Sequence, residues 1–131
     1  MDKREKVRGF LQLVKETIAN PVADRGWALV PRPENKDCIL QLGFKYEDIV
    51  ETLLGLSVEE YCEGPCRDRD QPGDLWVFGK IIENKDVYIK IKLASFGPLR
   101  IVRIISFHFA DHTLEYPFKE EKEEERDDEN N

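Results

Sequence analysis

The sequence predicts a single α+β domain in which N-terminal helices pack on a C-terminal antiparallel sheet. Apolar residues recur at helical spacing in the first half of the chain, and apolar and polar residues alternate in the second half. A segment rich in glycine, proline and charge separates the two halves. Helices followed by strands indicate the α+β class, and 131 residues suffice for one domain with its own core.

The first helix is predicted by an apolar face that repeats every three or four residues and stops at Pro21. That face consists of Val7, Phe10, Leu11, Val14 and Ile18. A short strand is expected over residues 26–30, before a proline-rich turn. A second helix is expected over residues 34–42, because Gly43 follows it and glycine readily adopts the left-handed conformation that ends a helix.

A third helix is predicted over residues 46–54, with an apolar face and Gly55 at its end. Ser57 and Glu60 then have the spacing of a capping box, in which each side chain satisfies a free amide at a helix start. We therefore expect a short fourth helix that runs through Tyr61. Residues 62–74 hold two glycines, two prolines and many charges, and are expected to form an exposed loop.

Three strands are predicted after this loop, over residues 75–82, 87–93 and 99–109. The middle strand alternates cleanly, so its apolar residues face one way while Tyr88, Lys90 and Lys92 face the other. The last strand has few polar positions and is expected to be central, with both faces covered.

Net charge is −7, but the charge is unevenly distributed. Residues 119–131 hold eight acidic and three basic residues, whereas residues 74–109 hold six basic and three acidic ones. We expect residues 1–118 to form the single domain and residues 119–131 to be a disordered acidic tail. The tail is either a solubilising terminus or a shield for the basic strands, and in the second case truncation after Phe118 is expected to tighten RNA binding.

The composition favours a cytoplasmic protein without membrane contact. No stretch approaches the roughly 18 apolar residues of a membrane helix, and the charged N-terminus is unlike a secretory signal. Three cysteines, an odd number, are typical of free thiols in a reducing compartment.

The cysteines and histidines suggest two kinds of site. Cys62 and Cys66 are four residues apart, as are His108 and His112, and such ligands suit tetrahedral zinc. The two pairs are separated by 41 residues, however, and a strand would hold the histidines about 13 Å apart. A cysteine nucleophile activated by histidine is disfavoured by the acidic surroundings of both thiols. We predict no metal and no cofactor.

The outward side of the middle strand supports a different chemistry. A phenol and two ammonium groups at a spacing of two residues can hold a phosphodiester. Cleavage of RNA through its 2′-hydroxyl needs a base, an acid and a cation near phosphorus, and histidine suits either proton role. Lysines on the side of a strand opposite its apolar residues are, however, common on any sheet with one face in solvent, and need not bind a ligand.

The segments "LGFKYEDIVETLLGLSVEEY", "DLWVFGK", "VYIKIKL" and "ISFH" occur in an order that resembles the MqsR family of toxins from type II toxin–antitoxin systems. The resemblance covers residues 42–108, and "LGLS" followed by "VYIK" is its most specific part. It implies a RelE-like α+β fold, cleavage of single-stranded messenger RNA without the ribosome, and neutralisation by a cognate antitoxin protein.

The resemblance places the family's active-site tyrosine on Tyr88 and a lysine on Lys90. Three further polar positions of the family fall near Glu63, on Val77 and on His108, which are different residues here. These departures imply either a site rebuilt around His108, with Tyr116 as a helper and His112 as a surface turn residue, or a scaffold that has lost cleavage.

We therefore expect a metal-independent endoribonuclease toxin that cleaves single-stranded messenger RNA. Its catalytic residues are expected to be Tyr88, Lys90 and His108, with further RNA contacts from Lys92, Lys80 and Tyr116. The alternative is a non-catalytic module on an MqsR-like scaffold that binds RNA or a protein.

Overall fold

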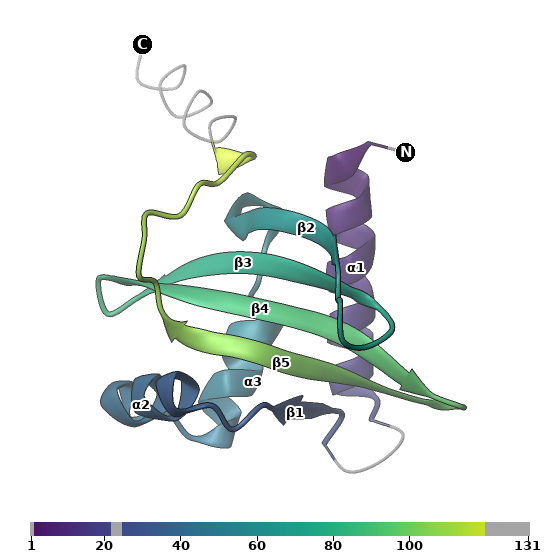
Figure 1. Ribbon diagram of the computed structural model, residues 1–131, viewed down its shortest axis with the longest axis horizontal. Helices are drawn as coiled ribbons and strands as arrows, with labels where there is room; N and C mark the ends of the chain where they lie inside the picture. Colours follow the sequence, from purple (N-terminus) through teal and green to yellow (C-terminus); the bar gives the residue numbers. More distant parts are fainter. Residues whose placement is uncertain (1, 22–24, 120–131) are drawn as a thin grey trace.

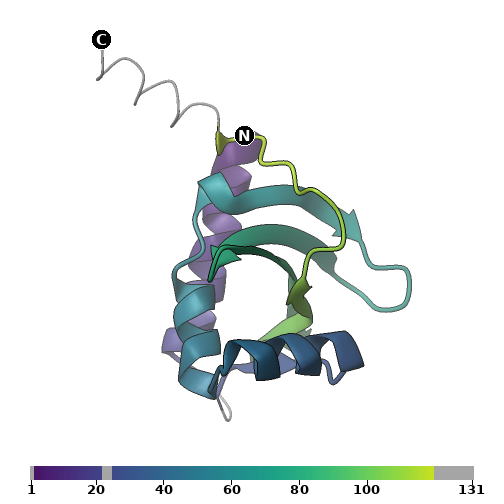
Figure 2. The ribbon, with the colours of Figure 1, turned by 90° about the vertical axis from the view of Figure 1, so that its left-hand side faces the viewer.

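The computed structural model describes residues 2–21 and 25–119, and it confirms the α+β class. The helices are α1 (Lys3–Ala19), α2 (Pro33–Leu42), α3 (Tyr46–Leu54) and a single 3₁₀ turn, η1 (Val58–Glu60). The strands are β1 (Trp27–Leu29), β2 (Tyr61–Arg67), β3 (Asp74–Ile82), β4 (Lys85–Phe96) and β5 (Leu99–Phe109). α1 and α3 lie on one side of the sheet, and α2 lies beside β5 (Figures 1 and 2).

The strands form one five-stranded sheet in the order β1-β5-β4-β3-β2. β2 to β5 pair antiparallel, as expected for the last three strands, but β1 pairs parallel with β5 and makes the sheet mixed. β5 therefore lies inside the sheet, in agreement with its predominantly apolar sequence. No helix among the described residues is long and apolar enough to span a membrane.

The core lies between the helices and the sheet. Phe10 of α1 stacks on Trp76 of β3 with ring centroids 4.5 Å apart, and Ile89 and Ile91 of β4 are fully buried. A fully buried aliphatic side chain of this size stabilises the fold by about 1.5–3 kcal/mol. The apolar residues of β4 therefore face the helices, as their alternation predicts, which leaves the opposite side of the sheet to polar residues.

The helix ends follow the sequence signals in part. Gly43 closes α2 with a φ of 67°, and Asn20 follows the last residue of α1. The capping box is present, because the Ser57 amide donates to a Glu60 carboxylate oxygen at 3.0 Å. The helix expected to run through Tyr61 is wrong, however, since only the turn η1 forms and Tyr61 begins β2.

The expectation of a loop over residues 62–74 is wrong for its first half, which forms β2. Tyr61 is buried against Trp76 and Phe78, and its hydroxyl donates to the Gly64 carbonyl at 2.6 Å. β2 is an edge strand with two register shifts against β3. Glycine and proline are tolerated in a bulged edge strand, so here they mark bulges rather than a loop.

The last described residues form a C-terminal strap, residues 110–118, that leaves β5 and passes β3 and β2 to reach the start of α1 (Figures 1 and 2). The strap begins on the side of the sheet away from α1 and ends beside the first turn of α1, where the Arg4 guanidinium lies over the Phe118 ring. Leu114 is buried over Gly79, and Phe118 stacks on Tyr61 with centroids 5.4 Å apart. The strap thus covers part of the sheet. Residues 120–131, most of the expected tail, lie outside the described residues.

Candidate functional site

The side of the sheet away from α1 and α3, here called the polar face, carries the side chains predicted to act. The strand register sets its rows, because Tyr88 lies opposite His108, Lys90 opposite Ser106, and Lys92 opposite Arg103. Opposed residues on neighbouring antiparallel strands are about 5 Å apart, so the side chains of each pair are neighbours on this face.

Tyr88, His108 and Lys90 come together on this face. The Tyr88 and His108 rings stack, with centroids 5.3 Å apart and planes at 16°. The Lys90 ammonium lies 5.8 Å from the centroid of the Tyr88 ring. The three residues that the sequence assigns to catalysis therefore form one cluster, although their roles stay a prediction.

The hydrogen bond of His108 defines which ring nitrogen is available. Its Nδ1 lies 3.0 Å from the carbonyl oxygen of Phe109. A carbonyl oxygen only accepts, so Nδ1 carries the hydrogen of the neutral ring. Nε2 then keeps its lone pair, and it is the atom that can take a proton from a substrate.

The strap adds His112, which the sequence suggested to be a surface turn residue. Its side chain is indeed 61% exposed, but its ring meets the Tyr88 ring edge-on with centroids 6.0 Å apart. His112 Nδ1 lies 2.6 Å from an Asp111 carboxylate oxygen, and this contact lowers the pKa of Asp111. The imidazoles of His108 and His112 therefore both contact the phenol ring of Tyr88. On a straight strand, two residues four positions apart would be too far from each other for this arrangement.

A cavity of about 300 Å³ lies between β2, β3, β4 and the strap, next to this cluster. Its lining residues are Cys62, Glu63, Val77, Tyr88, His112, Thr113, Leu114 and Glu115. Burial and the nearby Glu63 carboxylate raise the pKa of Tyr88, so its phenol stays protonated at neutral pH and can donate a hydrogen bond. Glu63 and Val77, two of the three positions at which the sequence departs from the resembled family, lie opposite each other here.

Cys62 offers no thiolate, and the described residues form no metal centre. Burial, with Glu63 and Asp86 nearby, raises the pKa of Cys62 to about 12, so the thiol is not the nucleophile that a cysteine hydrolase needs. Within residues 2–21 and 25–119, no three side chains of His, Cys, Asp or Glu converge on a point that could hold a metal ion. The zinc hypothesis therefore gains no support from the described geometry.

Lys92, one of the three residues expected to contact RNA, is buried and paired. Lys92 is only 2% exposed, with its ammonium 2.8 Å from an Asp68 carboxylate oxygen and 3.0 Å from the Pro72 carbonyl. It ties down the β2–β3 loop and cannot reach a phosphate without breaking that pair. This contradicts the expectation of an available cation at Lys92.

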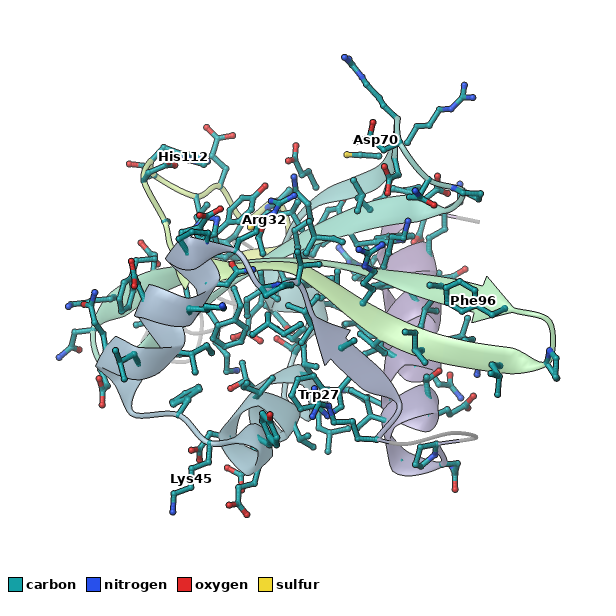
Figure 3. The ribbon with its side chains drawn as sticks, turned by 60° about the horizontal axis from the view of Figure 1, so that its bottom comes forward. Trp27, Arg32, Lys45, Asp70, Phe96 and His112 are labelled. Atoms are coloured by element: carbon teal, nitrogen blue, oxygen red, sulfur yellow. The ribbon has the colours of Figure 1, made fainter. Side chains whose placement is uncertain are left out.

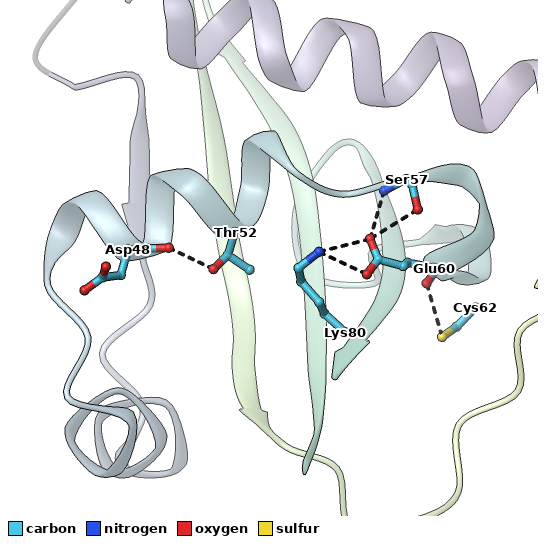
Figure 4. A network of polar contacts seen from close by, with 6 residues as sticks. All are labelled: Asp48, Thr52, Ser57, Glu60, Cys62 and Lys80. Carbon is cyan, nitrogen blue, oxygen red and sulfur yellow. Dashed lines mark hydrogen bonds and ion pairs between the residues drawn. The ribbon is translucent and has the colours of Figure 1, made fainter. Parts of the chain in front are cut away.

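Lys80 has an ion-pair partner of its own, whereas the buried hydroxyl of Tyr116 has no hydrogen-bond partner among the described residues. Lys80 lies opposite Val87, on the side of the sheet that faces the helices, and pairs with Glu60 at 3.0 Å (Figure 4). Tyr116 is on the strap, where its hydroxyl sits over Gly79. Burial and the nearby Asp86 carboxylate raise the pKa of Tyr116 to about 12. Lys80 is thus separated from the Tyr88 cluster by the sheet.

Asn35 of α2 shapes the site, and sequence reasoning missed it. Its side chain is fully buried, donates to the carbonyls of Val30 and Ile105 at 2.9 and 3.0 Å, and accepts from the Phe107 amide at 2.9 Å. The Asn35 side chain thereby supplies the hydrogen bonds that a neighbouring strand would make to β5, at the point where the pairing of β1 has ended. No sequence signal identifies such a residue, because an asparagine near a helix start resembles a surface position.

The bonds of Asn35 fall at a β-bulge. The register of β4 with β5 shifts between Lys90 and Ile91, so Ile105 is the extra residue. A bulge changes which side chains face which way. Here it places Arg103, in addition to Ser106 and His108, on the polar face, while Ile104 points into the core.

Comparisons of the chain with models of protein families, with curated proteins and with solved structures find no significant match. The function is therefore inferred from the residues of the polar face and their contacts.

Proposed function

We propose that this chain is a metal-independent endoribonuclease that cleaves single-stranded messenger RNA, and that it acts as the toxin of a type II toxin–antitoxin pair related to the MqsR family. The observation that carries the proposal is the stack of Tyr88 on His108 beside the Lys90 ammonium, on a sheet face that the helices leave uncovered. These groups supply a proton acceptor, a neutral donor and a cation within one cluster.

The chemistry is transfer of the phosphodiester to its own 2′-oxygen. Nε2 of His108 takes the proton of the 2′-hydroxyl, and that oxygen attacks phosphorus as the bond to the 5′-oxygen breaks. His112, when protonated, returns a proton to the departing 5′-oxygen. The products are a 2′,3′-cyclic phosphate and a 5′-hydroxyl, so atoms and charge balance without a metal.

Lys90 and Tyr88 act on the phosphate rather than on protons. Negative charge on the phosphoryl oxygens grows as phosphorus becomes five-coordinate, and an ammonium nearby stabilises it. The raised pKa of Tyr88 keeps the phenol protonated, so it can donate a hydrogen bond to a second oxygen. Each such contact contributes on the order of 10²-fold to the rate.

The test is a cleavage assay with purified protein, unstructured RNA and EDTA. Wild type is expected to release fragments that end in a 2′,3′-cyclic phosphate, and His108→Ala to lower the rate on the order of 10². Lys6→Ala, on exposed α1, is the matched control and should cut like wild type. If wild type leaves the RNA intact while a known ribonuclease cuts it, the proposal is wrong.

A second candidate is a binding module that holds RNA or a protein without cleaving it. Glu63 and Val77 favour it, because they replace polar positions of the resembled family and line the cavity beside Tyr88. Expression separates the two candidates. A toxin arrests growth when induced without its antitoxin, and His108→Ala relieves the arrest, whereas a binding module gives equal growth for both chains.

A further inference from the structure

The basic side chains around the sheet differ in whether a carboxylate pairs with them. Lys80 and Lys92 are paired with carboxylates. Lys90, Arg103 and Arg32 have no hydrogen-bond or ion-pair partner for their side chains within residues 2–21 and 25–119. An unpaired cation loses little when it binds a phosphate, because it breaks no internal bond.

The bulge places Arg103 in line with the candidate site. Arg103 lies opposite Lys92 across β4 and β5, and Lys90 is two residues along β4. Strand geometry puts the Cα atoms of Lys90 and Arg103 roughly 8 Å apart. If β5 alternated strictly from Phe107, which is buried in the core, Arg103 would point into the core as well, so the bulge held by Asn35 is what brings this cation to the polar face.

Arg32 continues the same line at the edge of the sheet. The Val30 amide donates to the Ile104 carbonyl at 2.9 Å, and the Arg32 amide donates to the Val30 carbonyl at 2.8 Å, so the turn before α2 is fixed beside β5. Figure 3 shows the Arg32 side chain rising on the same side of the sheet as His112 and Asp70, while Lys45 points to the opposite side.

We propose that Lys90, Arg103 and Arg32 form a phosphate track for single-stranded RNA that runs from the Tyr88–His108 pair across β5 to the turn before α2. This inference rests on the proposed ribonuclease function and adds the path of the substrate. The backbone of the RNA binds along the track, so phosphates to one side of the scissile bond are held by protein charge.

Charges around the face favour this direction over the alternative, toward the β2–β3 loop. That loop presents Asp68 and Asp70 at the other end of the face, and the Lys92 charge is already neutralised there. The strap closes the side of β2 and β3, where Leu114 covers Gly79. The loop also carries Arg67 and Arg69, but these alternate in sequence with Asp68 and Asp70, whereas the side chain of Arg32 at the opposite edge has no ion-pair partner among the described residues.

Salt dependence of binding tests the track without cleavage. A single-stranded RNA with 2′-O-methyl groups cannot be cut, and its affinity is measured by fluorescence anisotropy from low to moderate salt. The logarithm of the binding constant falls linearly with the logarithm of the salt concentration, and for a single strand each lost phosphate contact lowers the magnitude of this slope by about 0.7. Arg103→Gln and Arg32→Gln are each expected to lower the slope by this amount, Arg103→Lys to retain it, and Lys6→Gln on α1 to leave it unchanged.

Cleavage of substrates of two lengths supplies a second readout. Arg103→Gln and Arg32→Gln are expected to raise KM several-fold for a long RNA and to leave kcat unchanged. For a dinucleotide, which is too short to reach the track, KM should be unchanged as well. Circular dichroism of each variant verifies that it is folded.

The outcomes separate the two proposals. Wild-type protein that cuts RNA, with variants whose slopes and KM values equal those of wild type, overturns the track and leaves the ribonuclease function standing. Wild-type protein that neither binds nor cuts RNA overturns the function, and the track with it.

Discussion

The two ends of the polar face use the same residue type in opposite ways. Lys92 is buried at the loop end, where Asp68 and the Pro72 carbonyl hold its ammonium. Lys90 lies two residues along the same strand and on the same face, and it is half-buried. Its ammonium lies near the ring of Tyr88 and has no hydrogen-bond or ion-pair partner among the described residues. One lysine fastens a loop, and the other is left for a ligand.

The difference shows why an alternating strand pattern alone does not identify a binding residue. Both lysines satisfy the same sequence rule, and only the tertiary partner of Lys92 separates them. A buried ammonium must be paired because an unpaired one costs several kcal/mol, whereas a half-exposed one keeps part of its water. The end without internal partners is therefore where chemistry is expected, and the following variants test that division.

The largest expected change in stability is at Asn35, which holds the β5 bulge that lies between the two ends of the polar face. Asn35→Ala leaves the Ile105 carbonyl and the Phe107 amide without the partner that Asn35 supplies, while the Val30 carbonyl keeps its bond from the Arg32 amide. We expect the variant to lower the free energy of unfolding by about 3 kcal/mol, because each unsatisfied buried group costs roughly 1–3 kcal/mol before relaxation. Urea unfolding at neutral pH measures this. The matched control is Asn20→Ala, an exposed asparagine, which should change stability by less than about 0.5 kcal/mol. A similar loss in both variants would remove the special role of Asn35.

The next effect compares the two lysines directly. Lys90→Ala is expected to lower the cleavage rate on the order of 10² and to leave the melting temperature unchanged. Lys92→Met is expected to lower the melting temperature by about 5 °C and to keep the rate within about threefold of wild type. Both quantities are measured on both variants. The reverse result, a large rate loss only for Lys92→Met, would show that the division of the face is wrong.

Strong local periodicity allowed much of the fold to be predicted. The helical spacing of Val7 to Ile18 gives α1, and the clean alternation of β4 correctly places Tyr88 and Lys90 on the outward side. Gly43 ends α2 with the left-handed conformation expected of it. In each case the signal lies within a few residues, so no tertiary partner was needed to detect it.

The failures arise where distant segments decide the structure. β2 carries Gly64 and Pro65, which locally resemble a loop, and it is a strand because Tyr61 packs on β3. β1 has only three residues, too few to predict its parallel pairing with β5. In the candidate site, the stack of Tyr88 on His108 follows from the register of β4 with β5. The contact of His112 with Tyr88 depends instead on how the strap packs on Gly79.

The contact of the strap with Gly79 can be disrupted by adding a single methyl group. A Cβ at Gly79 would lie 2.6 Å from Leu114 Cδ1 and would also collide with the Tyr116 hydroxyl. Gly79→Ala is expected to cost about 2 kcal/mol through overpacking and to lower the cleavage rate several-fold, because His112 moves with the strap away from Tyr88. Gly9→Ala is the control, since nothing lies within 4 Å of its Cβ and alanine favours the helix by about 0.5–1 kcal/mol. Equal stability of the two variants would show that the strap is not seated on Gly79.

The smallest effect concerns the loop end and its dependence on pH. The hydrogen bond from Lys92, together with the Asp70 amide, lowers the pKa of Asp68 from 3.8 to about 2. A carboxyl whose pKa is lower in the folded than in the unfolded chain binds protons more readily when unfolded, so stability falls as the pH falls. The contribution of Asp68 is therefore complete above about pH 4 and is lost by about pH 2. Melting temperatures measured from pH 7 to pH 2 should fall less steeply in this window for Asp68→Asn than for wild type, while Asp70→Asn, on the same loop, should follow wild type. Parallel curves for Asp68→Asn and wild type would show that the Lys92 pair does not hold the loop end in solution.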